Sequence, residues 1–180
     1  MMDYDKLLNP TVLAIKPSGI RKFFDIAETM KDVISLGVGE PDFATPWKVR
    51  HAGITSLENS QTRYTSNWGL EQLRREICTY VKRKYELTYD HKTDVLVTVG
   101  GSEAIDATIR AITCPGDEII IPQPSYVCYE PMVTLAGGVP VIVETKAEHD
   151  FKLTPAQLRA AITPRTKARS EEHTSELQSR

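Results

Sequence analysis

The chain has 180 residues, enough for one domain with a sizeable hydrophobic core. Its 22 Lys and Arg nearly balance its 24 Asp and Glu, and a net charge of −2 gives no electrostatic attraction for nucleic acid or an anionic membrane. No apolar run approaches the length of a membrane span, and the N-terminal MMDYDKLLNP lacks the basic and apolar regions of a secretory signal. The composition therefore excludes nucleic-acid and membrane partners and predicts a soluble globular protein.

Cysteine and histidine usage indicates a cytoplasmic protein without a metal site. The three cysteines lie far apart with no CxxC spacing, which is typical of reduced thiols: Cys78, Cys114 and Cys128. The four histidines show no spacing typical of metal ligands: His51, His91, His149 and His173.

The sequence predicts three helices in the first half of the chain, two from apolar periodicity and one from a start signal. Ser18 can cap a helix whose apolar residues recur in steps of three and four: Ile20, Phe23, Phe24, Ala27 and Met30. After VISL (33–36), a short strand candidate, Thr45-Pro46 predicts a second helix that ends near Asn59. A third helix follows the loop SQTRYTSNWG, with one face formed by Leu70, Leu73, Ile77, Tyr80, Val81 and Lys84.

The second half of the chain alternates between apolar runs and helical patterns. The runs are nearly continuous, which is typical of strands covered on both faces in a parallel sheet. The pattern predicts strands at 94–99, 118–122 and 139–144, and helices at 104–112, at 126–136 and from Thr154-Pro155. This order predicts an α/β fold with a mostly parallel sheet and helices on both faces.

A glycine pair lies where the strand at 94–99 passes into the next helix. Ligands of open α/β sheets bind beyond the carboxyl ends of the strands, and Gly100-Gly101 occupies such a position. The first amides of a helix have no internal acceptor, and the helix dipole favours an anion there. Ser102 adds a hydroxyl, and Glu103 would offer its backbone N–H with its carboxylate turned away. On the motif alone, a phosphate site and a plain tight turn both fit.

A tyrosine follows the next predicted strand. Tyr126 comes after Pro124-Ser125, so it should lie at the same sheet edge as the glycine pair. Its ring could stack on a flat ligand, and it could equally be an ordinary core or surface tyrosine.

Four segments in order resemble one family, the class I/II aminotransferases, which are pyridoxal 5′-phosphate-dependent enzymes of fold type I. The segments are SLGVGEPDFATP, RYTSNWGLEQLRREI, VTVGGSEAI and DEIIIPQPSYVCYEPM. The resemblance spans residues 18–168 and implies that the chain is part of the large domain of such a transferase. It implies a pyridoxal 5′-phosphate cofactor, an L-amino acid and a 2-oxo acid as substrates, and a role in amino acid metabolism.

The resemblance also implies roles for individual residues. Gly101, Ser102 and Glu103 would hold the cofactor phosphate, and Tyr126 would stack on its pyridine ring. Gly39 would bring backbone close to the substrate carboxylate. Tyr64 would reach the phosphate of a partner subunit, which implies a homodimer.

No catalytic residue is identified in this chain. The resemblance implies a Schiff-base lysine, an acidic partner for the pyridine nitrogen and a substrate-binding arginine, all in segments beyond those present here. The lysines nearest the end of the chain lie in the wrong context to be the catalytic one: Lys146, Lys152 and Lys167.

The last twelve residues, RSEEHTSELQSR (169–180), resemble the translation of a sequencing-library adapter. With one aliphatic residue in twelve, this segment does not suit the buried strand that the family has after TPRTKA. We therefore expect an N-terminal arm and first helix at 1–30, the N-terminal part of the cofactor-binding large domain at 31–168, and a non-native tail at 169–180.

Two other functions remain open at this stage. A fold-type-I enzyme of another class, such as a C–S β-lyase, would share these segments. A non-catalytic module that binds pyridoxal phosphate would share them too, although such modules usually carry a DNA-binding domain before the family's own start.

Overall fold

The computed structural model of the chain describes residues 6–17, 19–30, 34, 41 and 43–171. The chain divides into two compact units, one formed by Met1–Ser18 with Val99–Arg180 and the other by Gly19–Thr98. The glycine pair and Tyr126 belong to the first unit, whereas Tyr64 belongs to the second. In the part of the chain that the structure describes, no helix is both long enough and apolar enough to cross a membrane.

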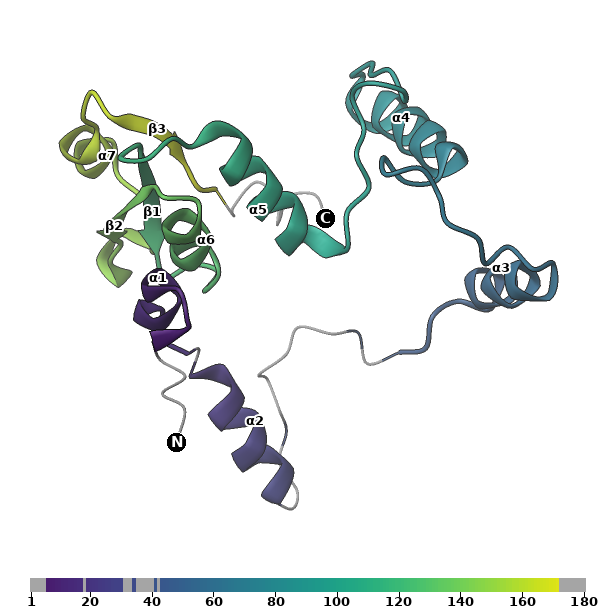
Figure 1. Cartoon of the computed structure of the whole chain (residues 1–180), viewed down its shortest axis with the longest axis horizontal. Helices are drawn as coiled ribbons and strands as arrows, with labels where there is room; N and C mark the ends of the chain where they lie inside the picture. The colour runs from purple at the N-terminus through teal and green to yellow at the C-terminus, as the bar shows by residue number, and fades with distance from the viewer. Residues whose placement is uncertain (1–5, 18, 31–33, 35–40, 42, 172–180) are drawn as a thin grey trace. The chain divides into compact units, whose positions relative to one another are not determined.

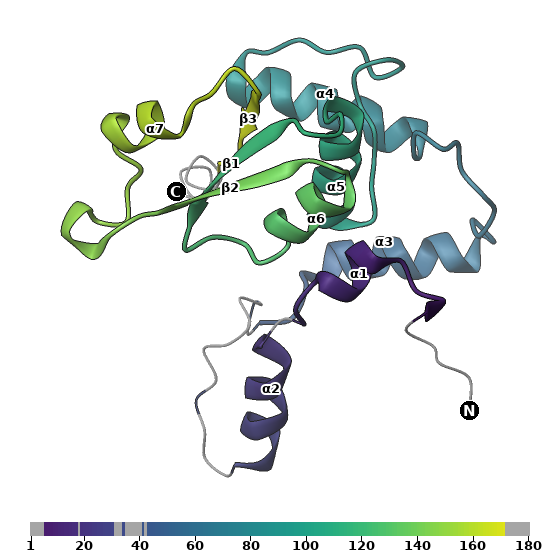
Figure 2. The ribbon, with the colours of Figure 1, turned by 60° about the vertical axis from the view of Figure 1, so that its left-hand side comes forward.

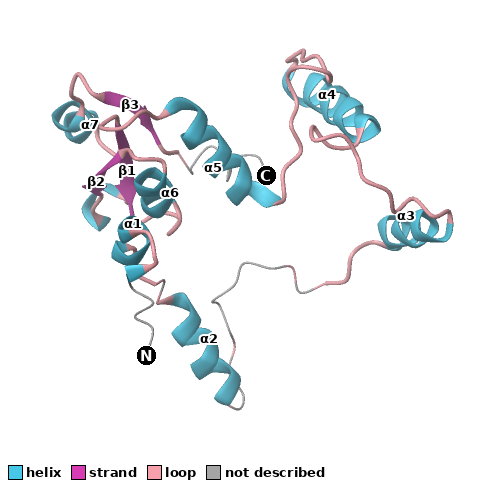
Figure 3. Cartoon of the chain, in the orientation of Figure 1, coloured by secondary structure: helices cyan, strands magenta, loops and turns pink. Residues whose placement is uncertain are grey.

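The unit Gly19–Thr98 contains the three helices predicted for the first half of the chain (Figure 3). They are α2 (Ile20–Thr29), α3 (Trp47–Glu58) and α4 (Glu71–Tyr85). Helix α3 ends at Glu58 with Asn59 as its C-cap, close to the predicted end, and Pro46 is its N-cap rather than its first residue. The predicted cap Ser18 and the predicted strand 33–36, apart from Ile34, lie outside the described residues.

The strand predicted at 94–99 is wrong, because residues 95–98 have no regular secondary structure. A strand is stabilised by a ladder of hydrogen bonds to a neighbour, and apolar composition does not supply that neighbour. In this segment, Val97 N–H donates to Trp68 O, a loop residue, at 3.1 Å. Val99 is 90% exposed, so the segment is not the twice-covered strand that its sequence indicates.

The unit with Val99–Arg180 is built on three parallel strands, β1 (Glu118–Gln123), β2 (Val139–Glu144) and β3 (Thr166–Arg169). Their order is β2-β1-β3, so β1 is central (Figure 1). The first two confirm the predicted strands at 118–122 and 139–144. Parallel strands end at a common edge, and here the carboxyl ends of β1 and β2 pair at Gln123 and Glu144.

Strand β3 was not predicted, and it reaches one residue into the expected tail. Arg169, the first residue of the expected non-native tail, is the last residue of β3. Ser170 N–H also donates to Ile120 O at 2.9 Å, so the ladder with β1 continues one residue further. Backbone hydrogen bonds do not depend on side-chain polarity, so the polar sequence TKAR can form this strand.

Four α-helices of this unit are α1 (Pro10–Ala14), α5 (Gly100–Ile112), α6 (Tyr129–Leu135) and α7 (Pro155–Ala161). Helix α1 was not predicted; the Asn9 side chain accepts from Thr11 N–H at its start. Helix α7 begins at the predicted place, where the Thr154 and Gln157 side chains each bond the other's backbone N–H. Helix α6 begins three residues later than predicted, at Tyr129.

The hydrophobic core lies between one face of the sheet and the helices α5 and α6 (Figure 2). Ile119 and Ile121 share that face because side chains alternate along a strand, and they pack with Ile109 and Val133. Ile120, which points to the opposite face, is also fully buried. The central strand is therefore covered on both faces, as its continuous apolar run predicts.

At the start of β1, the buried carboxylate of Glu118 makes the unit sensitive to acid. It accepts a hydrogen bond from the Thr163 hydroxyl at 2.5 Å and forms an ion pair with Arg165. The Thr163 hydrogen bond, followed by the Arg165 guanidinium, holds the pKa of this carboxyl below its ordinary 4.5, although burial acts in the opposite direction. A carboxyl with a lowered pKa stabilises the fold above its unfolded pKa, and the effect is lost as pH falls through the folded value.

We therefore expect Glu118→Gln to lower the stability at about pH 7, and the difference from wild type to shrink at about pH 3. Urea denaturation at both pH values measures this effect. Glu144→Gln, on the exposed face of the neighbouring strand β2, is the control and should change little. An equal loss for Glu118→Gln at both pH values would show that packing rather than charge is responsible.

Candidate functional site

The structure brings Ser102 and Tyr126 into direct contact. Ser102 lies in the first turn of α5, and Tyr126 follows β1 by three residues. The Ser102 Oγ and the Tyr126 hydroxyl oxygen are 2.8 Å apart, which is a hydrogen bond. The start of α5 and the carboxyl end of β1 therefore meet at one edge of the sheet, where ligands of α/β proteins bind.

Helix α5 begins with a sharp backbone turn at the glycine pair. Gly100 has φ +80°, which a residue with a side chain rarely adopts. An added Cβ at Gly101 would meet no atom within 4 Å, so the backbone there is open to an approaching group. The amides of the first turn have no acceptor within the helix, and the thirteen-residue helix adds its dipole. The helix start is therefore suited to an anion.

The carboxylate of Glu103 is engaged at the same turn. It accepts the backbone N–H of Val99, the residue that precedes the helix. This bond closes the turn around the glycine pair. Glu103 can then offer its backbone N–H to a ligand. The carboxylate still places a negative charge in the first turn, so an anion must bind to the amides rather than beside that side chain.

Four contacts hold Tyr126 and the turn before it. The Tyr126 ring meets Tyr129 edge to face, with centroids 5.7 Å apart and planes at 87°. Tyr129 N–H donates to Tyr126 O at 3.2 Å. Gln123 O, at the end of β1, accepts both the backbone N–H and the hydroxyl of Thr145, at 2.8 and 2.7 Å. Tyr126 remains 41% exposed, so part of its surface is available to a ligand.

These groups fit a phosphate ester that carries a flat ring. Backbone amides and a serine hydroxyl at a helix N-terminus are the donors that a phosphate needs. An aromatic side chain held in place by hydrogen bonds and a ring contact can stack on a heterocycle without a large loss of side-chain entropy. The observation that decides the fit is the Ser102–Tyr126 hydrogen bond, because it places phosphate donors and a stacking ring side by side.

The other predicted site residues lie elsewhere in the chain. Tyr64, in the loop between α3 and α4, is fully exposed. Gly39 lies outside the described residues. The predicted roles of Tyr64 and Gly39 therefore stay predictions.

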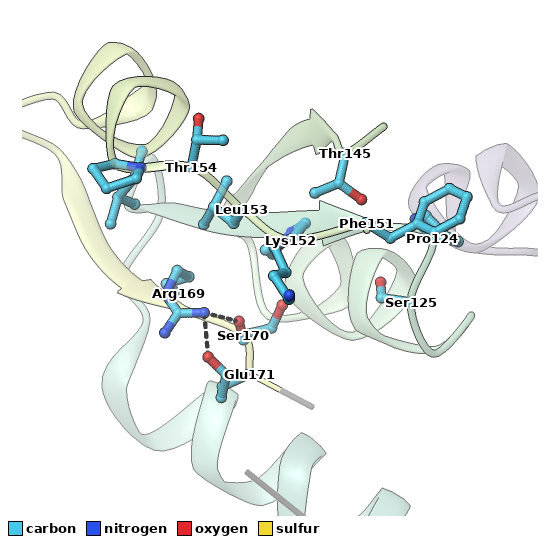
Figure 4. A pocket seen from close by; sticks show the side chains of 13 residues that line it. Pro124, Ser125, Thr145, Phe151, Lys152, Leu153, Thr154, Arg169, Ser170 and Glu171 are labelled. Carbon is cyan, nitrogen blue, oxygen red and sulfur yellow. Dashed lines mark hydrogen bonds and ion pairs between the residues drawn. The ribbon is translucent and has the colours of Figure 1, made fainter. Parts of the chain in front are cut away.

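A cavity of about 460 Å³ opens beside the carboxyl ends of the strands, toward α7. Figure 4 shows Arg169, Ser170 and Glu171 on one side of it and Pro124 and Ser125 across from them. Arg169 is paired with Glu171 at 2.6 Å, and both belong to the expected non-native tail. This lining gives no ground for assigning the cavity a ligand.

Sequence reasoning missed two residues with structural roles, one beside the site and one in the unit Gly19–Thr98. Thr145 follows β2, and nothing in its sequence context marks its pair of bonds to Gln123 O. Arg74 is 7% exposed on α4, and its position carries a signal. It lies four residues after Leu70 and three before Ile77, so it falls on the apolar face of its helix, where an arginine needs buried acceptors.

Comparison with known proteins defines the class. The sequence model of the family "Aminotransferase class I and II" matches residues 31–172. The Bacillus subtilis (strain 168) protein named aminotransferase YugH is 55% identical over 161 residues, which are 89% of this chain and 42% of that protein. Aspartate aminotransferase of Pyrococcus abyssi is 42% identical over 86% of this chain and 40% of its own length. The solved aspartate aminotransferase from Thermus thermophilus with maleate has a TM-score of 0.81 and 38% identity, covering 90% of this chain and 43% of that chain.

The chain belongs to the class I and II aminotransferases, a family that depends on pyridoxal phosphate. Its α/β fold is part of the fold-type-I transferase fold, as predicted. The chain spans about two fifths of the length of the curated relatives that it matches.

Proposed function

We propose that this chain is the N-terminal part of an aminotransferase that moves an amino group from an L-amino acid to a 2-oxo acid. The observation that carries the proposal is the hydrogen bond between Ser102 and Tyr126 at the start of α5, in a chain of this family. When bound, pyridoxal 5′-phosphate supplies an electron sink that stabilises negative charge at the amino acid's Cα.

The residues of this chain bind and orient the cofactor. The backbone amides of Gly101, Ser102 and Glu103, with the Ser102 hydroxyl, hold the phosphate, and the helix dipole adds to the attraction. The Tyr126 ring packs against the pyridine ring, and its hydroxyl is held by Ser102. The phosphate contacts and the Tyr126 contact together would fix the pyridine ring relative to the phosphate. This restricts the geometry in which a substrate can react.

Other parts of the site come from outside the unit that contains α5. Tyr64 reaches the phosphate of a partner subunit in a homodimer, and Gly39 brings backbone to the substrate carboxylate. The protein works in the cytoplasm, in amino acid metabolism and biosynthesis. The resemblance that implies these roles and the exposure of Tyr64 support this part of the proposal.

The lysine that reacts with the cofactor lies beyond this chain. The relatives are more than twice as long as the matched region, and the segments that carry the lysine follow it in the family. In this proposal, residues 1–30 form an N-terminal arm and first helix, 31–168 the start of the large domain, and 169–180 a non-native tail. We use "full-length enzyme" for the product of the complete reading frame that contains residues 1–168.

Transamination by the full-length enzyme tests the proposed function. Apoenzyme reconstituted with pyridoxal phosphate should convert L-amino acids and 2-oxoglutarate into the matching 2-oxo acids and L-glutamate. Omission of either the cofactor or the 2-oxo acid should abolish turnover. Release of pyruvate and ammonia from a cysteine conjugate without a 2-oxo acid would contradict the proposal and favour a β-lyase.

The 180-residue chain alone should show no transaminase turnover. It lacks a lysine in the family's context, and apolar side chains of its helices are exposed, Phe23 at 73% and Trp47 at 60%. Such surfaces favour aggregation. An assay of the purified chain with pyridoxal phosphate, an amino acid mixture and 2-oxoglutarate measures this. Turnover above that of free cofactor would contradict the prediction.

A further inference from the structure

Thr145 holds the end of the central strand through two hydrogen bonds to one atom. Its backbone N–H donates to Gln123 O at 2.8 Å, and its hydroxyl donates to the same oxygen at 2.7 Å. Gln123 is the last residue of β1, and its register partner on β2 is Glu144. The N–H bond therefore extends the parallel ladder by one step, whereas the hydroxyl bond is added by the side chain. A carbonyl oxygen has two lone pairs, so it can accept both bonds.

The end of β2 is itself held from helix α7. Gln157 Nε2 donates to Glu144 O at 3.0 Å. The Gln157 side-chain oxygen accepts from the backbone N–H of Thr154 at 3.0 Å and from its hydroxyl at 2.9 Å. The Gln157 side chain therefore joins the start of α7 to the end of β2. Thr145 follows Glu144 directly, so it is presented to Gln123 from a backbone that is fixed on its preceding side.

The carbonyl that Thr145 holds leads along the chain to Tyr126, three residues later. The ring of Pro124 fixes its own φ angle, so the chain after Gln123 has fewer directions open to it. Beyond Tyr126, the Tyr129 N–H donates to Tyr126 O at 3.2 Å, and the two rings meet edge to face. The short segment that carries Tyr126 is therefore held at its start by Thr145 and at its end by Tyr129.

These residues all belong to the unit that contains α5, and the contacts end at the hydrogen bond between Tyr126 and Ser102. We propose that Thr145 is a positioning residue for the cofactor ring, because its hydroxyl fixes the end of β1 and thereby the orientation of the Tyr126 ring. A stacking ring that is already held loses less freedom when its ligand binds. This proposal rests on the proposed function.

Titration of the full-length apoenzyme with pyridoxal phosphate tests the proposal. Thr145→Val keeps the backbone hydrogen bond and the branched side chain but loses the hydroxyl. We expect it to weaken pyridoxal phosphate binding about 3- to 10-fold, the effect of one lost neutral hydrogen bond. Thr145→Ser keeps a hydroxyl that can make the same bond, so its dissociation constant should stay within about 2-fold of wild type.

The same substitution in a Tyr126→Leu enzyme distinguishes positioning from a general loss of stability. If Thr145 acts through the ring, Thr145→Val should weaken binding by less than about 2-fold further once the ring is absent. Thr134→Val is the matched control, since Thr134 is also half-buried and its hydroxyl donates to Glu130 O within α6 at 2.9 Å. This control should leave the dissociation constant within about 2-fold of wild type.

An unchanged dissociation constant for Thr145→Val would overturn the proposal. The same loss with and without the Tyr126 ring, or an equal loss in Thr145→Ser or in the Thr134→Val control, would overturn it as well. If Thr145→Val gives no soluble protein, Thr145→Ala also lacks the hydroxyl and decides in both backgrounds. A wild-type enzyme that does not bind pyridoxal phosphate would instead overturn the proposed function, and this inference with it.

Discussion

Replacing Ser102 with alanine should weaken pyridoxal phosphate binding to the full-length enzyme by about 10- to 100-fold. A hydrogen bond to a charged group contributes about 1.5–3 kcal/mol, and each 1.4 kcal/mol corresponds to roughly a factor of ten in affinity. The substitution also removes the 2.8 Å contact with the Tyr126 hydroxyl. Titration of the apoenzyme with pyridoxal phosphate, followed by absorbance, gives the dissociation constant.

A hydroxyl elsewhere on α5 provides the matched control for Ser102. The Thr108 hydroxyl donates to Ala104 O at 2.7 Å, within the same helix. Thr108→Ala therefore removes a hydroxyl of α5 away from the proposed site and should leave cofactor affinity within about 2-fold. Equal effects of the two substitutions would show that Ser102 supports the helix rather than the phosphate.

Replacing Tyr126 with leucine should weaken cofactor binding by about 10- to 100-fold. Replacing it with phenylalanine should weaken cofactor binding by less than about 10-fold. Leucine removes the ring, and aromatic contacts contribute about 0.5–1.5 kcal/mol beyond the area that they bury. Both substitutions lose the hydroxyl bond to Ser102, which contributes about 1 kcal/mol as a neutral pair. The same titration gives the dissociation constants of both variants. The ratio of these two constants measures the contribution of stacking.

A double variant separates the hydrogen bond from the ring. If the Tyr126 hydroxyl acts only by orienting the Ser102 hydroxyl, Tyr126→Phe should have little further effect once Ser102 is alanine. Additive effects would show that the two hydroxyls contact the cofactor separately. Equal affinities for Tyr126→Leu and Tyr126→Phe would contradict the stacking role.

The helices were the most predictable part of the fold, because their pattern is local. The spacing of apolar residues predicted α2, α4 and α5, and the Thr45-Pro46 start signal predicted α3. Helix α1 was missed because a five-residue helix is too short to show a period. Its start is marked instead by Asn9 and Pro10, a cap and a first helical residue.

Strands were less predictable because they depend on a neighbour. The apolar run at 94–99 has the composition of a strand, but residues 95–98 do not form one. Thr166–Arg169 has a polar composition and nevertheless pairs with β1. Pairing partners are set by tertiary structure, which a single segment does not encode. The strands β1 and β2 were predicted correctly because each carries a nearly continuous apolar run in the sequence.

The sequence placed Ser102 and Tyr126 at one sheet edge, and the hydrogen bond between them confirms that they are close, although the strand predicted before Ser102 at 94–99 did not form. It could not show that the two hydroxyls bond to each other, since a contact over 24 residues depends on how α5 and β1 pack. The bond from Arg74 to His91 O spans 17 residues and escaped prediction for the same reason. Glycines at turns are visible in a sequence, but the atoms they approach are not.

The decisive measurement is to sequence the source DNA across the codons for Ala168 and Arg169, on a molecule long enough to leave any adapter behind. It tests whether residues 1–168 are the start of an aminotransferase whose reactive lysine lies further along the frame. The account predicts that the frame continues from Ala168 into an apolar strand and later reaches a Ser-x-x-Lys segment. A genome that encodes RSEEHTSELQSR followed by a stop codon would contradict it, and the catalytic assignment would then be withdrawn.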